Sequence, residues 1–334
     1  MKEDASVQSA LQGVVFYPVQ GDTAINAPAV KDFGVWAYPT FVVLDKTGQP
    51  IHRTMGFSDG AIWGAWLEGI KADPVALTER QARHAATPNF RDAFALGQDA
   101  LSNKRCAEAR RYFEQALALD PQAAIEQNVH MQIVRAVYQG LDTGETTLEQ
   151  AGDATAQLLQ SPDAKPAHIL EACERLLGIV DKLGPETVAP YLEMAYPRLA
   201  SLDDERLKER HQAFLIDYAL YVENDPEKAV AAKRASLPNG WESDADQLNE
   251  MAWWCFERRV NLEEAEALAR RGVELAPDNT ARANLLDTLA EIVYLRGDAA
   301  QAAELIRQAV QANSTSQYLQ NQLKRFTSPS GEES

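Results

Sequence analysis

The side chains with the most distinctive chemistry in this sequence are three cysteines, and no two of them share a short motif. Cys106, Cys173 and Cys255 lie far apart, and the sequence contains no Cys-x-x-Cys. Thiol–disulfide exchange needs a thiolate of lowered pKa, usually beside a resolving cysteine. Each of the three instead lies in a helical pattern among alanine and leucine, which is typical of a small buried side chain. We therefore assign no catalytic role to them.

The other residue types that could bind a metal or react are equally scattered. The sequence has five histidines without metal-ligand spacing, no glycine-rich phosphate loop and no Ser/His/Asp motif. The acidic run Asp203-Asp204-Glu205 opens a predicted helix, where negative charge favours the helix dipole. We expect no metal, no cofactor and no catalytic residue. The histidines are His52, His84, His130, His168 and His211.

The densest aromatic cluster is Trp253-Trp254-Cys255-Phe256. Trp253, Trp254 and Phe256 are candidates for the floor of a peptide-binding groove. Successive residues of a helix point in different directions, so we expect at least two of the four to pack in the core instead.

Composition and charge exclude several classes of partner. The chain has 334 residues and a net charge of −17, which argues against nucleic-acid backbones and anionic membrane surfaces. No apolar run is long enough to cross a bilayer, and the start Met1-Lys2-Glu3-Asp4 does not resemble a secretory signal. As written, the chain is expected in the cytoplasm, with a protein or peptide as its partner.

The elements that would position a binding surface centre on residues 34–48. Tyr38-Pro39 forces an extended turn, and the apolar run from Thr40 to Leu44 predicts a buried strand. Lys46-Thr47-Gly48 then predicts a tight turn into a partner strand from Ile51 to Met55.

The flanking segments predict further elements of a small α/β fold. Met1 to Leu11 is typical of the end of a helix, and Val14 to Val19 predicts a strand whose Pro18 places it at an edge or at the strand's end. Asp22 to Phe33 predicts a short helix. After the hairpin, Ser58-Asp59 would cap a helix that runs to about Lys71.

This order of elements, over residues 1 to about 72, resembles the thioredoxin fold from just after its active site. In that family the matching proline is cis, and its neighbours offer a backbone edge to an extended substrate. The resemblance therefore implies that Tyr38, Pro39 and Thr40 form a substrate-binding edge. From the tripeptide alone, Pro39 would simply start a strand; the whole pattern of elements is more specific.

The sequence departs from the thioredoxin family at its start, because the first strand and the Trp-Cys-x-x-Cys segment are missing. The missing strand would lie between Val14–Val19 and Thr40–Leu44. Those strands must then pair directly, borrow a strand from another molecule, or leave an open edge that favours self-association. Our hypothesis is an N-terminally shortened product. Bacterial relatives with appended repeats are often exported, so a longer native N-terminus would allow a periplasmic or exported location.

Residues 73–89 predict a linker, and from Phe90 the sequence becomes helical to its end. Three segments agree on the tetratricopeptide period of about 34 residues, with small and large apolar residues in matching places. We therefore predict tetratricopeptide-like hairpins, in which small residues let paired helices approach closely. The matching residues are Leu96, Gly97, Ala109, Phe113, Ala116 and Pro121; Ala252, Phe256, Ala265, Gly272 and Pro277; and Leu289, Ala290, Gly297, Asp298, Ala302 and Ala309.

The middle of the array is helical but irregular, with helices expected over Pro166–Leu183, Thr187–Leu199 and Glu205–Val222. The predicted fold is a partial α/β thioredoxin-like domain over residues 1–72, then the linker, then an all-α tetratricopeptide-like superhelix (an α-solenoid) over 90–326. Residues 327–334 are polar and expected to be disordered.

Two functions of different class follow. The resemblance implies a thiol–disulfide oxidoreductase family member whose repeats recruit the client. The cysteines of this chain favour the alternative, a redox-silent scaffold or adaptor that binds polypeptides at the Tyr38-Pro39-Thr40 edge and in the helical groove.

Overall fold

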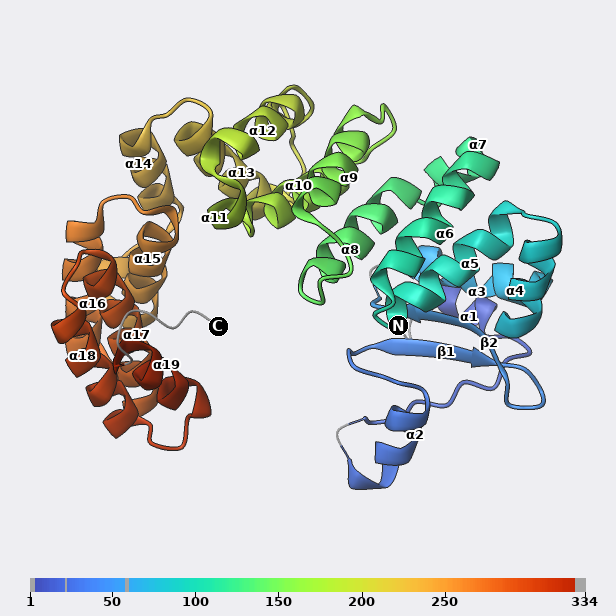
Figure 1. Cartoon of the computed structure of the whole chain (residues 1–334), viewed down its shortest axis with the longest axis horizontal. Helices are drawn as coiled ribbons and strands as arrows, with labels where there is room; N and C mark the ends of the chain where they lie inside the picture. The colour runs from blue at the N-terminus through green and yellow to red at the C-terminus, as the bar shows by residue number, and fades with distance from the viewer. Residues whose placement is uncertain (1–3, 22, 58–59, 328–334) are drawn as a thin grey trace. The chain divides into compact units, whose positions relative to one another are not determined.

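The computed structural model describes residues 4–21, 23–57 and 60–327 (Figure 1). The predicted cap at Ser58-Asp59 and the predicted tail from residue 328 lie outside this part. The described residues form mostly helix, with one sheet of two strands, so the helical part of the predicted fold class is confirmed. The chain divides into two compact units, residues 1–202 and 203–334.

The first unit contains the sheet and twelve of the described helices. Its strands are β1 (Thr40–Leu44) and β2 (Pro50–Met55), and a 3-10 turn covers Ala24–Asn26. Its helices are α1 (Ala5–Ala10), α2 (Ala27–Asp32), α3 (Gly60–Ala72), α4 (Leu77–Ala86), α5 (Phe90–Ser102), α6 (Cys106–Leu119), α7 (Pro121–Glu126), α8 (Val129–Leu141), α9 (Leu148–Gln160), α10 (Pro166–Leu177), α11 (Val180–Leu183) and α12 (Pro185–Leu199).

The second unit is helical throughout its described residues, with a 3-10 turn over Trp241–Ser243. Its helices are α13 (Lys208–Tyr221), α14 (Pro226–Ser236), α15 (Ala245–Arg258), α16 (Leu262–Leu275), α17 (Asn279–Leu295), α18 (Ala299–Ala312) and α19 (Gln317–Thr327). No helix in the described part of the chain combines the length and the apolar character that crossing a bilayer requires.

The hairpin of β1 and β2 forms where the sequence predicts it. The strands are antiparallel, with Phe41 opposite Thr54 and Val43 opposite His52. The turn between them is held by Asp45, whose carboxylate accepts hydrogen bonds from the backbone N–H of Thr47 at 2.7 Å and of Gln49 at 2.9 Å. An aspartate that bonds backbone groups two and four residues ahead stabilises a tight turn.

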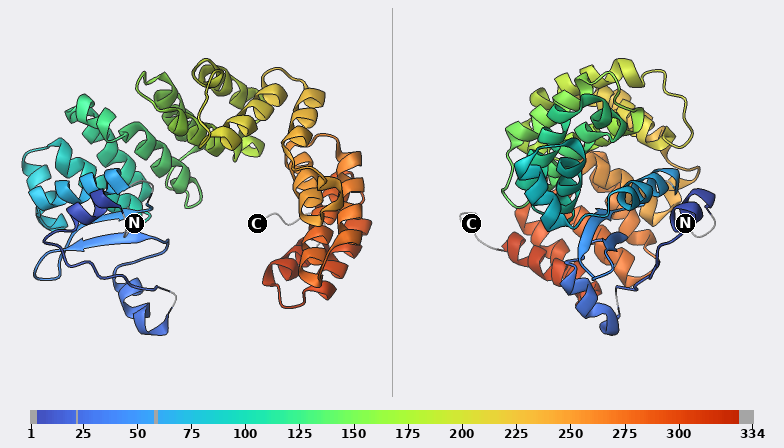
Figure 2. Two further views of the ribbon diagram at one scale, coloured as in Figure 1. Left: turned by 180° about the vertical axis from the view of Figure 1, so that it is seen from behind. Right: turned by 90° about the vertical axis from the view of Figure 1, so that its right-hand side faces the viewer.

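Both faces of the hairpin are covered, which explains why β1 is a continuous apolar run. On one face Phe41 and Val43 pack against a cluster from α1 and α3 that includes Trp63 and Leu67. The other face of β2 contacts α5, and the two strands lie beside this helix when seen from behind (Figure 2). Ile51 of β2 is buried on that side.

The predicted strand Val14–Val19 is wrong, because this segment pairs with no strand of the described residues. Val14 is anchored by a hydrogen bond from its N–H to the carbonyl of Leu11 and packs against the α1–α3 cluster. Beyond it residues 15–20 form no regular secondary structure, and Val15 is 94% exposed. A β-prone composition forms a strand only where a neighbouring strand supplies hydrogen bonds and packing.

The helical pairs predicted from the repeat pattern do pack on each other: α5 with α6, α15 with α16, and α17 with α18. In the first pair Gly97 lies under the ring of Phe113, which is fully buried, and Ala109 and Ala116 are fully buried as well. Small residues at these places allow close approach of the two helices. The main difference from prediction in the irregular middle is that the helix from Pro166 ends at Leu177 and a short helix follows; in addition, the helix expected from Glu205 begins at Lys208.

The segment predicted as a linker contains α4, whose Arg80 and His84 are buried. His84 hydrogen-bonds Gln115 of α6 at 3.0 Å, and α4 packs against α5. The chain between the sheet and the first helical pair is therefore a packed part of the first unit. The predicted domain limits themselves stay a prediction.

The close contact at Gly97 predicts opposite effects for two glycine substitutions. A Cβ at Gly97 would lie 2.7 Å from the ring of Phe113, whereas a Cβ at Gly69 in α3 would meet nothing within 4 Å. Gly97→Ala should destabilise the protein by about 1 to 3 kcal/mol through overpacking. Gly69→Ala should be neutral or stabilise it by up to about 1 kcal/mol through helix propensity. Urea unfolding followed by circular dichroism measures both, and a Gly97→Ala protein at least as stable as wild type would contradict the packing.

Candidate functional site

Tyr38, Pro39 and Thr40 lie directly before and at the start of β1, at the surface. The Tyr38–Pro39 peptide bond is cis. The Tyr38 ring is 63% exposed and lies over the backbone of Gly21, where a Cβ would come within 2.3 Å of the tyrosine oxygen. The hydroxyl of Thr40 donates to the carbonyl of Ala37 at 2.7 Å, which fixes the turn into the strand.

The hydrogen-bonding pattern of the hairpin shows which backbone groups of β1 are free. Gly56 donates its N–H to the carbonyl of Pro39 at 2.9 Å, and Phe41 and Val43 follow at the alternate positions that face β2. Because successive residues of an antiparallel strand direct their N–H and C=O groups to opposite sides, Thr40, Val42 and Leu44 direct theirs away from β2. Among the described residues, no hydrogen bond reaches these outward groups.

The outer edge of β2 is different, because part of it is satisfied within the strand. The N–H of Arg53 donates to Nδ1 of His52 at 2.9 Å. Burial lowers the pKa of His52 to about 4, so its ring is neutral at neutral pH and Nδ1 can accept. The open edge of the sheet is therefore β1. Charged side chains and proline usually protect an exposed edge strand from pairing with another chain, and β1 has neither.

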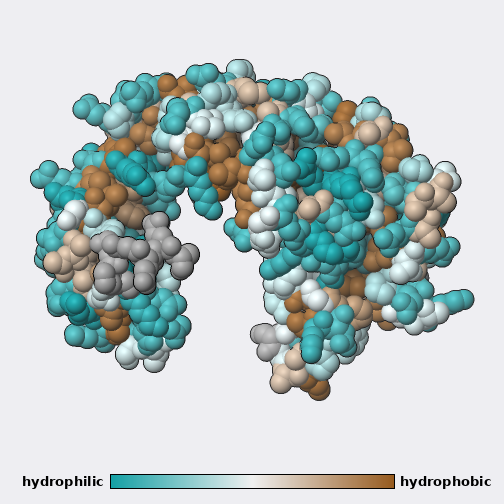
Figure 3. All heavy atoms as spheres, in the orientation of Figure 1, coloured by the Kyte–Doolittle hydropathy of each residue, from teal (hydrophilic) through white to brown (hydrophobic). Residues whose placement is uncertain are grey.

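Exposed apolar side chains lie at β1 and in the residues just before it. Trp36, Tyr38 and Leu44 are all exposed, and in the segment that follows α1 Val15 and Tyr17 are exposed as well. On the face seen in Figure 3, hydrophobic surface lies over the region of β1 and α2. Exposed apolar groups beside unpaired backbone groups are more common on a surface that binds a partner than on one without a binding role.

Trp36 connects the open edge to the first helical pair. Its Nε1 donates to the carbonyl of Ser102, the last residue of α5, at 2.7 Å. The ammonium group of Lys104 lies 4.2 Å from the centre of the Trp36 ring, within the range of a cation–π contact. Beside them, Arg53 of β2 donates to the side chain of Asn103 at 2.5 Å and to the carbonyl of Phe33. These contacts fix the hairpin against the α5–α6 connection.

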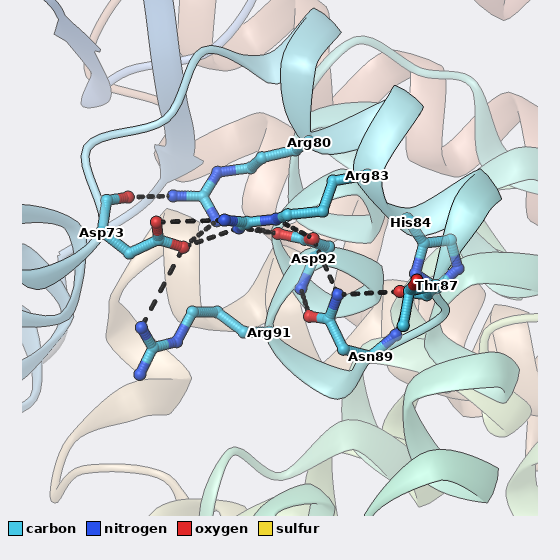
Figure 4. Close-up of polar contacts among 8 residues, drawn as sticks. All are labelled: Asp73, Arg80, Arg83, His84, Thr87, Asn89, Arg91 and Asp92. Carbon is cyan, nitrogen blue, oxygen red and sulfur yellow. Dashed lines mark hydrogen bonds and ion pairs between the residues drawn. The ribbon is translucent and has the colours of Figure 1, made fainter.

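A second set of contacts joins the end of α3 to α4 and α5 through buried charges (Figure 4). We call Asp73, Arg80, Arg83 and Asp92 the ion-pair cluster. Arg80 is 2% exposed and Asp92 is fully buried, and their side chains hydrogen-bond at 3.1 Å. Arg83 donates to Asp92 at 2.5 and 2.7 Å and to Asp73 at 2.7 Å.

The local sequence supplies what the buried carboxylate of Asp92 needs. Asn89 caps α5 by accepting the N–H of Asp92 at 2.9 Å, and its amide donates back to that carboxylate at 2.8 Å. Burial by itself would raise the pKa of Asp92, but hydrogen bonds from Arg83 and Asn89 hold it below its ordinary value of 3.8. The cluster therefore stabilises the fold fully above that value, and its contribution is lost as the pH falls through the lower folded pKa.

The three cysteines are buried and unpaired. Burial, with a smaller effect of Glu145, raises the pKa of Cys106 to about 11. Burial likewise raises the pKa of Cys173 and of Cys255 to about 12. All three are neutral thiols at neutral pH, so none has the thiolate character that disulfide exchange requires.

The aromatic cluster on α15 divides between core and surface. Trp254 and Cys255 are buried in the core of the second unit, and the Trp254 ring lies 5.6 Å from the guanidinium of Arg258. Trp253 and Phe256 are half-buried, with ring centres 5.0 Å apart. These two remain the candidates for an aromatic contact surface. Across the described residues, no three His, Cys, Asp or Glu side chains lie where they could share a metal ion.

Sequence reasoning missed the ion-pair cluster and the role of Trp36. One signal was present: Arg80 and Arg83, three residues apart on a helix, are bracketed by Asp73 and Asp92. That spacing is also common on exposed helices, where such pairs contribute little. Only the packing of α4 against α5 shows that Arg80 and Asp92 are buried.

Loss of the Asp92 charge should destabilise the first unit strongly. Asp92→Asn leaves the buried Arg80 and its partner Arg83 short of an anion, and breaking one side of a buried pair costs about 3 to 5 kcal/mol. The matched control is Glu114→Gln, which removes an exposed pair with Arg110 on α6, worth about 0.3 to 0.5 kcal/mol. Thermal unfolding followed by circular dichroism measures both; equal effects would show that the cluster is not a stabilising element.

Comparison with known proteins gives a limited similarity. No family model matches the chain. Over 148 residues, which are 44% of this chain, it is 26% identical to Protein POLLENLESS 3-LIKE 2 of Arabidopsis thaliana. The match spans 34% of that protein's length, about a third.

Proposed function

We propose that this chain is a non-catalytic polypeptide-binding scaffold that holds an extended segment along the open edge of β1. The observation that carries the proposal is that Thr40, Val42 and Leu44 direct their backbone groups away from β2, with no partner among the described residues. An extended peptide added to such an edge gains main-chain hydrogen bonds, and neighbouring side chains give it selectivity.

The surroundings of the edge favour an apolar or uncharged segment. Trp36 and Tyr38, just before β1 in the chain, offer exposed aromatic side chains, and the strand itself carries no charge. The net charge of −17 disfavours nucleic acid and anionic surfaces as competing partners. The contacts from Trp36 and Arg53 to the α5–α6 connection hold the edge in place before a ligand binds, which reduces the entropy lost on binding.

We also propose a second binding surface, on the helical part. We propose that α5–α6, α15–α16 and α17–α18 are tetratricopeptide-type hairpins. Gly97 under Phe113 supplies a close approach within the first hairpin, and Gly272 of α16 lets Leu285 of α17 pack closely between neighbouring hairpins. Trp253 and Phe256 are the aromatic side chains that we propose as partner contacts on this part.

The second candidate function is that of a thioredoxin-like oxidoreductase with client-recruiting repeats. The order of α2, Tyr38-Pro39-Thr40, β1, β2 and α3 favours the resemblance. The buried thiols, whose pKa values are all raised, speak against such activity in this chain. By this reasoning the edge binds a polypeptide without exchanging its disulfides.

Binding at the edge is tested with unfolded, carboxymethylated α-lactalbumin labelled with fluorescein, measured by anisotropy. Val42→Pro removes an outward N–H and should weaken binding at least about tenfold, because proline blocks strand addition while being tolerated on an edge. Val42→Thr keeps the N–H and should bind within about twofold of wild type. If Val42→Pro unfolds, Tyr38→Ala, an exposed position, replaces it. Equal binding by wild type and the edge variants would refute the proposal.

The redox alternative has a separate test. In an insulin-reduction assay with dithiothreitol, the chain should give no turnover above the background without protein, because none of its cysteines is a thiolate at neutral pH. A triple Cys→Ala variant is the control for non-specific effects. Turnover that disappears in this variant would show that the chain is an oxidoreductase.

A further inference from the structure

The second unit buries two carboxylates on one face of α17. Asp287 and Glu291 are four residues apart, so they lie one above the other on the helix, and they are 8% and 7% exposed. Side chains of this type are almost never so buried without partners. Both are covered by α19, the last helix of the described residues.

The helix α19 meets this face with a single stripe of polar side chains. Tyr318, Gln322 and Arg325 follow an i, i+4, i+7 spacing, which places them along one side of a helix. The Tyr318 hydroxyl donates to Asp287 at 3.0 Å, and the Gln322 amide donates to Glu291 at 3.0 Å. The guanidinium of Arg325 forms an ion pair with Glu291.

These contacts do not satisfy both carboxylates. Oδ1 of Asp287 is buried without a hydrogen-bond partner in the described structure. The titratable groups that face Asp287 are Glu291 on its own helix and Tyr318 and Arg325 on α19. Burial, only partly offset by the Tyr318 hydrogen bond, raises the pKa of Asp287 to about 6, with Glu291 raising it further. At neutral pH the docked α19 therefore covers an ionised, under-satisfied carboxylate.

The attachment of α19 is also limited in other respects. The helix has 11 residues, and a helix of this length is marginal in water by itself. Only Leu319 and Phe326 of α19 are buried, the latter with its ring 5.2 Å from that of Tyr294. Tyr318 and Arg325 stay about half exposed even when docked.

We propose that the Asp287–Glu291 face of α17 is a docking surface for a partner helix that carries an arginine and two hydrogen-bond donors along one stripe, and that α19 occupies it in cis as a displaceable cap. The chemistry of the partner is given by the occupant itself, a basic helix with an aromatic hydroxyl. The acidic surface and the chain's net charge of −17 complement such a helix. This surface does not involve β1, so its test is independent of the proposed function.

The test uses the full chain and a fluorescein-labelled peptide with the sequence of residues 313–327, measured by anisotropy. Tyr318→Ala with Arg325→Ala loosens the cap at two half-exposed positions, and this open-cap variant should bind the peptide at least about tenfold more tightly than wild type. Adding Glu291→Gln should reverse the gain. Adding Glu304→Gln, an exposed carboxylate on α18, should not.

The pH dependence of peptide binding by the open-cap variant gives a second readout. Because the docked pKa of Asp287 is raised, docking is favoured when it is protonated and weakens as the pH rises through about 6. The open-cap variant should therefore bind the peptide about tenfold more tightly at pH 5 than at pH 7.5. Asp287→Asn should remove this dependence.

Three outcomes would overturn the proposal. The first is equal peptide affinity for wild type and the open-cap variant, and the second is an equal effect of Glu291→Gln and Glu304→Gln. The third is a wild-type dimer, seen by light scattering, that the open-cap substitutions dissociate, since this would assign the surface to α19 of a second copy. If the open-cap variant does not fold, Asp287→Asn in an otherwise wild-type chain should tighten the cap at pH 7.5 and slow amide exchange in α19; unchanged exchange would contradict the proposal.

Discussion

The contact between Arg80 and Asp92 is the interaction on which the first unit depends. It lies where the chain leaves the α/β segment and enters the helical array, and both groups are almost completely removed from water. A charge in that position is tolerated only when its partners are fixed. Arg83 and Asn89 complete the set, so the end of α3, the helix α4 and the start of α5 are held as one packed body.

That packing has a consequence for the sheet. Because α5 is fixed, it can cover one face of β2 while α1 and α3 pack on the other face of the hairpin, so a sheet of only two strands has helices against both faces. Trp36 and Arg53 add contacts to the α5–α6 connection. The outer backbone edge of β1 stays open, because helices that pack on the faces of a sheet do not cover its edge. A rigid frame around an unpaired edge is the arrangement that suits strand addition.

The second unit uses charge in a different way. In the ion-pair cluster of the first unit, Asp92 receives hydrogen bonds from three side chains, whereas Asp287 receives one and keeps an oxygen without a partner. The direction of the pKa follows this difference: it is lowered for Asp92 and raised for Asp287. Burial acts in the same sense on both carboxyls, so the number and charge of the donors decide which form is stable. The ion-pair cluster around Asp92 therefore holds its helices in place, whereas the contacts of Asp287 are of the kind that a change in ligand or pH can alter.

Most of the local elements could be predicted from the residues alone. Helical periodicity located the paired helices, and Gly97 marked where α5 and α6 approach, because both signals depend on neighbours within one hairpin. Gly272 of α16 instead meets Leu285 of α17, in the next helical pair. The turn at Lys46-Thr47-Gly48 and the two strands around it were likewise predictable. Only the tertiary structure decided that Val14–Val19 stays unpaired and that Arg80 is buried. A strand needs a neighbouring strand, and a buried charge needs partners that are distant in the sequence. Adjacent residues in the chain reveal neither the neighbouring strand nor the distant partners.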